Sequence, residues 1–221
     1  MNPYNFFKFL DDKGERKYLL RIKLLNDPRY TDIYSRLNIP NVPPITKDDL
    51  KVGGDLDLRY TQISSLPDGL KVGGGLDLSD TEITSLPAGL EVGGDLDLNG
   101  STITSLPPDL KVGGSLDLGG IEIEYLPAGL KVGGDLNLEY CGELISLPDG
   151  LKVEGNLHLG HTYITSLPDG LKVGGELNLY NTHITSLPAG LEVGGDLDIR
   201  STEITSLPDD LEVGGEIYKG F

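Results

Sequence analysis

The histidines are the first residues to consider for chemistry, because imidazole titrates near neutral pH and is a common metal ligand. The chain has three of them, His158, His161 and His183. His158 and His161 fall on different parts of one short sequence unit, and no pair of carboxylates completes a set of metal ligands with them. There is no Ser-His-Asp order, and the Gly-Gly pairs lack the surroundings of a phosphate-binding loop. The sequence therefore predicts no enzyme, no metal site and no cofactor.

Acidic residues are the second candidates, because they recur at a fixed spacing. One position, repeated about every 20 residues, holds Asp57, Asp77, Asp97, Asp117, Asn137, His158, Asn178, Asp198 and Tyr218. A second position, two residues earlier, holds Asp55, Gly75, Asp95, Ser115, Asp135, Asn156, Glu176, Asp196 and Glu216. The chain has 35 acidic and 18 basic residues and a formal net charge of -17. These rows predict an acidic stripe along one surface.

Three interpretations of this stripe are open. It is a solvated surface that keeps the protein soluble, or it is a docking face that steers a basic partner protein toward the chain. Imitation of DNA, in which rows of carboxylates occupy a nucleic-acid-binding protein, is a special case of docking. Calcium is the third and least favoured interpretation, because Ca²⁺ needs about six to eight oxygens converging on one point. Direct binding of nucleic acid by so acidic an array is not expected, because phosphate contacts need Lys and Arg.

The stripe changes character where Asn137, His158 and Asn178 replace aspartates. The same stretch holds most of the aromatic side chains of the repeated region, namely Tyr140, His161, Tyr163, Tyr180 and His183. The spacing places Tyr140 beside His161 and Tyr163 beside His183. Tyrosine is enriched at binding hot spots, so this patch is a candidate for specific contact with a partner. Ordinary sequence drift of exposed residues is the alternative.

An internal repeat must position all of these residues. A Leu-Pro pair recurs with a period of 20 and one step of 21, starting at Leu66, Leu86, Leu106, Leu126, Leu147, Leu167, Leu187 and Leu207. The unit reads L-x-V-G-G-x-L-x-L-x-x-T-x-I-x-S-L-P-x-G. A unit this short cannot hold a core of its own, so it must bury its leucines against the units before and after it. The sequence therefore predicts a repeat solenoid of about nine coils with stacked parallel strands.

Within each coil the residue types predict the direction of the side chains. In the D-L-D-L segment, alternation sends the leucines into the core and the aspartates toward solvent. The Gly-Gly pair permits a tight turn or a positive φ. A hydroxyl follows the strand in most copies and is expected to bond main chain that would otherwise be buried unpaired. These hydroxyls belong to Thr61, Thr81, Ser101, Thr162, Thr182 and Thr202.

The single step of 21 residues lies in the segment LEYCGELISL, residues 138 to 147. Cys141 takes the position of Thr81, and Gly142 is the inserted residue. We expect Cys141 to be a small buried residue of the stack, because free cysteine is among the most buried residue types. A reactive thiol needs an electropositive setting, and none is visible in the sequence nearby.

The motif L-x-L-x-x-T-x-I-x-x-L-P resembles the leucine-rich repeat pattern L-x-L-x-x-N-x-L-x-x-L-P over residues 45–221. The 20-residue period and the Leu-Pro pair are similar to the short repeats of secreted bacterial effectors and of repeat proteins from bacteria and phages. This resemblance implies a binding scaffold rather than a catalyst. Two departures, Thr at the family's Asn position and Val-Gly-Gly before the strand, leave a flatter β-solenoid open as the cross-section of the coil.

Residues 1–44 lie outside the repeat and are expected to form an N-terminal cap over the first coil. Asp27 and Pro28 predict the start of a helix that spans residues 28–37. Residues 5–25 are compatible with a hairpin, which the alternation of Leu20, Ile22 and Leu24 favours, or with two short helices. No secretory signal and no membrane-length apolar run is evident, and one cysteine fits a reducing compartment. The sequence therefore predicts a cytoplasmic protein, in the cell that makes it or in a host cell.

Taken together, the residues predict a leucine-rich-repeat-like solenoid that binds another protein without catalysis. The expected partner has a basic surface, and one form of the hypothesis is a bacterial or phage inhibitor that occupies its target. A DNA mimic and a purely structural or assembly protein are the two alternatives.

Overall fold

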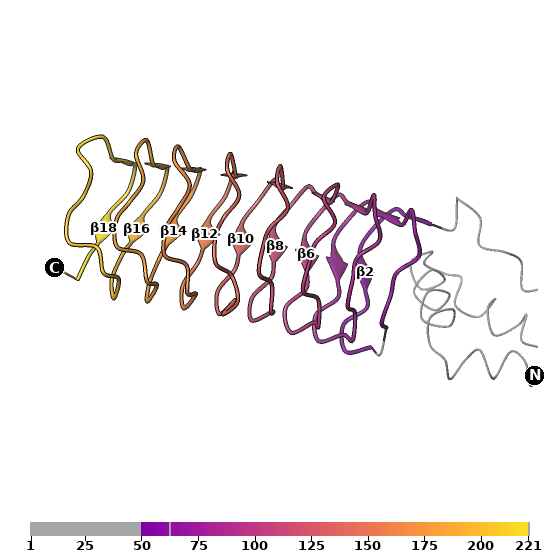
Figure 1. The fold of residues 1–221 in the computed structure, drawn as a ribbon. Coiled ribbons are helices and arrows are strands. Elements are labelled where there is room, and N and C mark those ends of the chain that lie inside the picture. The colour runs from indigo at the N-terminus through magenta and orange to yellow at the C-terminus, as the bar shows by residue number, and fades with distance from the viewer. Residues whose placement is uncertain (1–49, 62, 221) are drawn as a thin grey trace, which may run out of the picture.

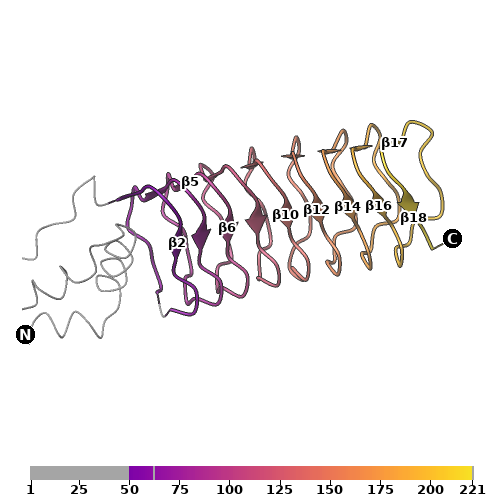
Figure 2. The same cartoon turned by 180° about the vertical axis from the view of Figure 1, so that it is seen from behind.

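The computed structural model describes residues 50–61 and 63–220, and Figures 1 and 2 show these residues as one row of stacked coils. Each coil contributes two short strands, one to each of two nine-stranded sheets. The first sheet contains β1 (Lys51–Val52), β3 (Lys71–Val72), β5 (Glu91–Val92), β7 (Lys111–Val112), β9 (Lys131–Val132), β11 (Lys152–Val153), β13 (Lys172–Val173), β15 (Glu192–Val193) and β17 (Glu212–Val213). The second contains β2 (Leu56–Asp57), β4 (Leu76–Asp77), β6 (Leu96–Asp97), β8 (Leu116–Asp117), β10 (Leu136–Asn137), β12 (Leu157–His158), β14 (Leu177–Asn178), β16 (Leu197–Asp198) and β18 (Ile217–Tyr218).

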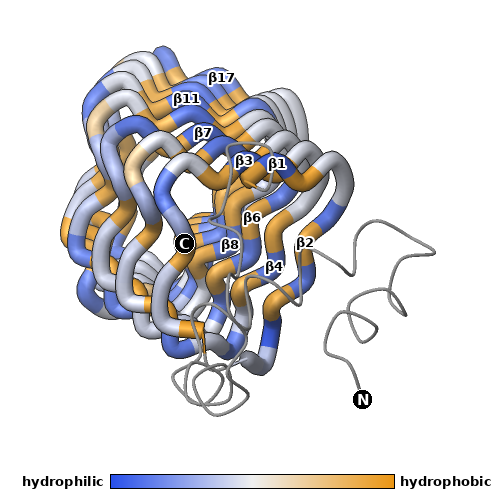
Figure 3. Tube along the Cα trace, turned by 90° about the vertical axis from the view of Figure 1, so that its right-hand side faces the viewer, coloured by the Kyte–Doolittle hydropathy of each residue, from blue (hydrophilic) through white to orange (hydrophobic). Residues whose placement is uncertain are grey.

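The structure confirms the predicted parallel solenoid. Every strand pairs in parallel with the strand one coil away, and equivalent residues are partners, as Leu116 and Leu136 are. No helix occurs within the described ranges. The second sheet was predicted from the D-L-D-L segment, whereas the first sheet, formed by the Lys-Val and Glu-Val pairs, was not. Because each coil has strands on two sides, the flatter β-solenoid left open by the sequence describes the cross-section well (Figure 3).

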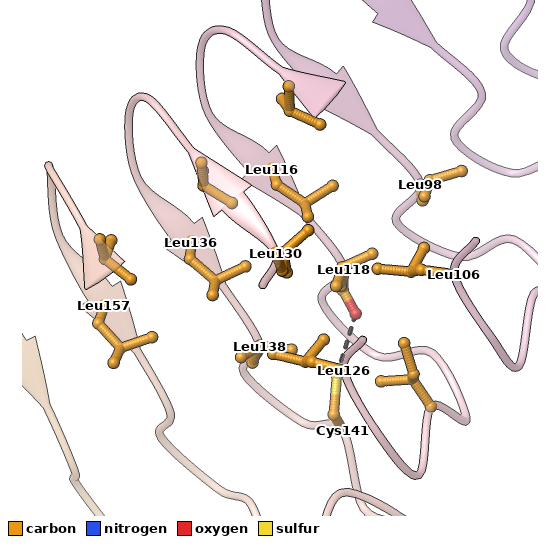
Figure 4. Packing of buried hydrophobic residues seen from close by; sticks show 14 of the residues in the cluster. Leu98, Leu106, Leu116, Leu118, Leu126, Leu130, Leu136, Leu138, Cys141 and Leu157 are labelled. Carbon is orange, nitrogen blue, oxygen red and sulfur yellow. Dashed lines mark hydrogen bonds between the residues drawn. The ribbon is translucent and has the colours of Figure 1, made fainter. Parts of the chain in front are cut away.

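The core consists of aliphatic residues that repeat from coil to coil. Each coil contributes leucines from the second sheet, a valine from the first sheet, and the Ile and Leu that lead to proline. Leu98, Leu118 and Leu138 are fully buried and lie one above another (Figure 4). Burial at about 25 cal/mol per Å² of apolar surface makes this stack the main source of stability. The last described coil is less well covered, since Leu211 and Val213 are only partly buried.

The Gly-Gly pairs have a role beyond the turn that was expected. None of the described ones has a positive φ; instead, the backbones of successive coils approach too closely for a side chain. A Cβ at Gly113 would lie 2.3 Å from the carbonyl oxygen of Gly93. The first glycine of the pair donates its N–H to the preceding coil, as Gly113 does to Val92 at 2.9 Å. The chain bends at this pair between its two strands, as the turn expectation had it, and the absence of a side chain also permits hydrogen bonding between coils.

Positive φ angles occur at two other places in most of the described coils. One is the glycine after Leu-Pro, for example Gly129 with φ +78°. The other is the residue that ends the turn after the second-sheet strand, where side chains are common despite the strain of this conformation. That position, called here the strand-end position, holds Tyr60, Asp80, Gly100, Gly120, Tyr140, His161, Asn181 and Ser201.

The hydroxyl row largely behaves as predicted. Thr81 Oγ1 donates to the carbonyl of Leu78 at 2.6 Å, and Thr61, Thr162, Thr182 and Thr202 make the equivalent bond. Ser101 is the exception, because its buried hydroxyl has no hydrogen-bond partner. Without the methyl group of threonine its rotamer is less constrained.

We predict opposite results for two alanine substitutions in this row. Thr81→Ala removes a buried hydrogen bond and leaves the carbonyl of Leu78 unpaired, so it should lower the free energy of unfolding by about 1–2 kcal/mol. Ser101→Ala removes a hydroxyl that bonds nothing and should be neutral or stabilising. Guanidinium unfolding of both variants checks this, and a loss at Ser101 as large as at Thr81 would contradict it.

Cys141 is fully buried in the hydroxyl row, as expected. Its Sγ donates to the carbonyl of Leu118 in the preceding coil at 3.0 Å (Figure 4). Ile121, which stands in the hydroxyl position of that preceding coil, has no group that could make this bond. Burial raises the pKa of the Cys141 thiol to about 11, so the thiol stays protonated and unreactive at neutral pH.

The predicted cap of residues 1–44, with its helix 28–37 and its hairpin or helices at 5–25, lies outside the described residues. Among the described residues, no helix has the length and hydropathy needed to cross a membrane.

Candidate functional site

The acidic stripe lies on the second sheet, and the two rows have the register that the repeat predicts. Asp57 pairs with Asp77, Asp97 with Asp117, and Asn137 with His158. The side chains are not simply solvated, because most of them accept a hydrogen bond from the backbone N–H two residues later. These acceptors are Asp57, Asp77, Asp97, Asp117, Asn137, Asn178 and Asp198, at 2.8–3.2 Å.

The second acidic row forms hydrogen bonds between coils. Asp55 Oδ1 accepts the N–H of Gly75 at 2.7 Å, and Asp95 Oδ1 accepts the N–H of Ser115 at 2.7 Å. Asp135, Asn156 and Asp196 accept in the same way. Both rows therefore pair backbone N–H groups that strand contacts leave free. This structural role was not predicted from the sequence, and asparagine fills it as well as aspartate.

The charge of the stripe is partly neutralised at its two ends. Arg59 contacts Asp57 at 3.0 Å and Asp77 at 3.6 Å, and Arg200 contacts Asp198 at 2.6 Å. Burial raises the pKa of the Asp97 carboxyl, the hydrogen bond from Asn99 opposes this, and the charges of Asp117, Asp77 and Asp80 add to the rise. The repulsion expected among stacked aspartates is thus concentrated between the two arginines.

We predict that Asp97→Asn stabilises the protein at neutral pH. It removes the repulsion and keeps the acceptor for Asn99, so the gain should be about 0.5 kcal/mol. Because the folded pKa of Asp97 is raised, the native state binds its proton first as pH falls. The advantage of the variant should therefore shrink as the pH drops through that pKa.

Asp198→Asn is the matched control for this prediction, because it occupies the same position but breaks an ion pair. Burial raises the pKa of Asp198, but the hydrogen bonds and charge of Arg200 outweigh burial and lower it. The substitution should cost about 1 kcal/mol. Thermal unfolding at pH 7 and pH 3 measures both variants, and the same sign of change at pH 7 would contradict the assignment.

A shallow hollow of about 450 Å³ lies in the middle of the second sheet, where the stripe changes character. Asp117, Asn137, His158 and Asn178 from four successive coils line it, together with Glu139. Asn137 Nδ2 donates to Asp117 Oδ1 at 3.0 Å, and Asn178 Nδ2 lies 3.3 Å from Glu139 Oε1. The amide donors are thus used within the hollow, while its carboxylates keep a second oxygen free to accept.

Both ring pairs predicted from the spacing are present. Tyr140 stacks on His161 with centroids 4.6 Å apart and ring planes at 5°, and Tyr163 lies 5.6 Å from His183. A third ring follows the first pair toward the C-terminus, because the rings of His161 and Tyr180 pack edge to face with their centroids 5.4 Å apart. His183 Nδ1 lies 3.7 Å from a carboxylate oxygen of Glu203 in the following coil.

Sequence reasoning missed two members of this series. The guanidinium of Arg200 lies over the ring of Tyr180 at 5.8 Å and over that of Tyr218 at 5.5 Å. Together with Tyr140 and His161 these residues form a continuous run, called here the aromatic row. The sequence held part of this information, since Tyr180 and Arg200 share one repeat position, but the rotamer that brings Arg200 over two rings is a tertiary feature.

The first sheet differs in charge from the second. Its outward row reads Lys51, Lys71, Glu91, Lys111, Lys131, Lys152, Lys172, Glu192 and Glu212. Glu91 bonds Lys71 at 2.6 Å and Lys111 at 2.9 Å, and these hydrogen bonds lower its pKa to about 2. The outward row of this sheet therefore does not contribute to the net negative charge of the protein.

Metal-binding groups of three or more His, Cys, Asp or Glu do not occur among residues 50–61 and 63–220. The three histidines lie in the same region of the array, but His161 and His183 are engaged with rings of neighbouring coils.

Comparisons with known proteins complete the description. No family model matches the chain, and no curated protein matches it. Among solved structures, the leucine-rich repeat domain of a Shigella effector is similar, with 17% identity and a TM-score of 0.41 over 98% of this chain and 94% of that one. The architecture itself, a parallel array of 20-residue coils with inward leucines, is leucine-rich-repeat-like.

Proposed function

We propose that this protein is a non-catalytic interaction scaffold that binds a basic partner protein through the second sheet. The observation that carries the proposal is the position of the hollow and of the exposed rings. The hollow spans the coils of β8 to β14 and the rings lie on those of β10 to β14, where the acidic row gives way to Asn137, His158 and Asn178. A rigid, stacked array is a suitable platform for such a surface, because its rings lose little freedom on binding.

The remaining acidic surface supports attraction of the partner rather than its specific recognition. The carboxylates on both rows bond backbone N–H groups with one oxygen, and several are half-buried. Long-range charge raises the association rate and falls off with salt. The rings, in contrast, provide the kind of contact that dominates binding energy. In this proposal the bound scaffold covers the basic surface of its partner and inhibits it by occupancy.

The test is capture of a partner from a lysate of the source cells by wild type and by two variants of equal charge. The first carries Asn at Asp57, Asp77, Asp97 and Asp117; it should fold, because Asn137 and Asn178 make the same backbone bond. The control carries Asn at four exposed turn residues, Asp68, Asp149, Asp169 and Asp209. Loss of a basic partner in the first variant but not in the control supports a docking face.

Further outcomes separate the alternatives. Steep loss with salt and competition by DNA would favour a DNA mimic, for which the regular carboxylate rows are the supporting observation. A partner that resists salt but is lost on Tyr163→Ala or Tyr180→Ala would favour the ring contacts. Capture that is equal in all variants would contradict the proposal, and self-association in light scattering without any captured partner would favour an assembly role.

A further inference from the structure

The aromatic row ends at Tyr140, and the next strand-end position toward the N-terminus carries no side chain. One face of Tyr140 stacks on His161, and the side chain is 61% exposed. Gly120 occupies the same position one coil earlier, with φ +72°. A Cβ built at Gly120 would meet no atom within 4 Å. The second face of Tyr140 is therefore open over a gap one coil wide, called here the vacant rung.

Amide and carboxylate groups lie beside the vacant rung. A Cβ at the neighbouring Gly119 would lie 2.9 Å from Asn99 Nδ2, 3.1 Å from Asp117 Oδ1 and 3.2 Å from Asn137 Nδ2. The two amide nitrogens already donate, to the carbonyl of Gly119 and to Asp117 Oδ1, so Asp117 Oδ2 is the acceptor that remains. On the far side, Asp80 Oδ1 reaches over Gly100, to within 2.6 Å of the Cβ position there. The rung thus lies beside an aromatic face and the carboxylate of Asp117, and the carboxylate of Asp80 covers the strand-end position one coil further on.

The cations of the array lie elsewhere. Between Arg59 and Arg200 the sequence contains Lys71, Lys111, Lys131, Lys152 and Lys172 and no other Lys or Arg. All five belong to strands of the first sheet. No basic side chain of the described coils therefore competes for the carboxylates at the vacant rung.

We propose that the vacant rung binds the guanidinium of an arginine from the partner protein; this inference rests on the proposed function. Guanidinium is planar and weakly hydrated, so it stacks on an aromatic face and donates in its own plane to carboxylates. The spacing suits it, because Tyr140 and His161 already stack at 4.6 Å across one coil. The protein makes a related contact itself, where Arg200 lies over Tyr180 and Tyr218 while bonding Asp198.

Lysine fits the same place less well. Its ammonium is compact and strongly hydrated and has no flat face to continue a stack. A neutral ring of the partner would stack but would offer no donor to Asp117 Oδ2 or to the carboxylate of Asp80. Of these three groups, only arginine both stacks on the ring of Tyr140 and donates hydrogen bonds to a carboxylate.

The experiment compares binding of hexa-arginine and hexa-lysine, which carry the same charge, by calorimetry at 150 mM salt. We expect wild type to bind hexa-arginine about tenfold more tightly, with shifts of the Tyr140 and His161 ring protons in NMR. Gly120→Tyr should abolish the preference by filling the rung, since Tyr60 and Tyr140 adopt this backbone conformation. Gly150→Tyr, at a glycine with φ +71° and open space in a different turn, should retain it.

Tyr140→Ser tests the same contact without filling space, because Ser201 occupies the strand-end position in a later coil. It should also remove the preference for arginine. Equal binding of both peptides by wild type would overturn the vacant rung as an arginine site. That result would leave the proposed function intact if the partner is still lost on substitution of the aspartates, so the two failures are distinguishable.

Discussion

We expect Gly94→Ala to lower the free energy of unfolding far more than Gly53→Ala does. A Cβ at Gly94 would lie 2.8 Å from the carbonyl carbon of Gly74 and 2.9 Å from the backbone nitrogen of Gly75. Both are main-chain atoms that cannot rotate away. To make room, the coils must separate and stretch the hydrogen bond from Gly94 to Gly74, which is 2.9 Å long. We expect a loss of about 3 kcal/mol in the free energy of unfolding.

Gly53 is the control because it is the first glycine of the same motif in the first described coil, and a Cβ there would meet no atom of the described residues within 4 Å. Gly53→Ala should change the free energy of unfolding by less than about 1 kcal/mol. Guanidinium titration followed by circular dichroism measures both. Equal stability of the two variants would show that the coils separate without cost, which contradicts the close-approach explanation.

One natural substitution supports this explanation. Glu154 replaces the first glycine of the pair in the coil of β11. Seven of the other described coils donate an N–H from this position to the preceding coil, as Gly174 does to Val153 at 2.9 Å, but Glu154 makes no such bond. A side chain is thus tolerated there once, at the loss of an inter-coil hydrogen bond, whereas the second glycine of the pair occurs in every copy.

We expect Leu118→Ala to lower the free energy of unfolding by a similar amount, for a different reason. Leu118 is fully buried between Leu98 and Leu138, and its removal leaves a cavity that rigid neighbouring coils cannot fill (Figure 4). Large-to-small substitutions of this kind cost about 2–5 kcal/mol. We expect about 3 kcal/mol here, because the site lies in the middle of the array and both adjacent coils depend on it.

Leu211→Ala gives the comparison for this prediction. Leu211 packs against the core but is only partly buried, in the last described coil. The loss should be less than half of that at Leu118, because less contact is removed and fewer coils are affected. Denaturant unfolding of the two variants measures both losses. An equal loss of unfolding free energy at both sites would contradict the prediction that the array depends most on its central coils.

The sequence determined the features that follow from strict repetition. In a parallel array with a fixed period, equivalent positions become neighbours, so the leucine stack, the row of aspartates and the pairs Tyr140–His161 and Tyr163–His183 could all be predicted. The buried position of Cys141 followed from its alignment with Thr81. Departures from the repeat, such as Asn137 and His158, also indicated which coils carry the candidate site.

Only the tertiary structure decided how the coils meet. The distance between successive backbones makes the Gly-Gly pairs a requirement for close approach, and it brings Asp55 within hydrogen-bond reach of Gly75 in the next coil. Side-chain torsions place Arg200 between two rings and leave Ser101 unpaired. The vacant rung at Gly120 is likewise a space between coils. A one-dimensional pattern specifies which residues are neighbours, whereas the rise between coils and the rotamers specify which atoms touch.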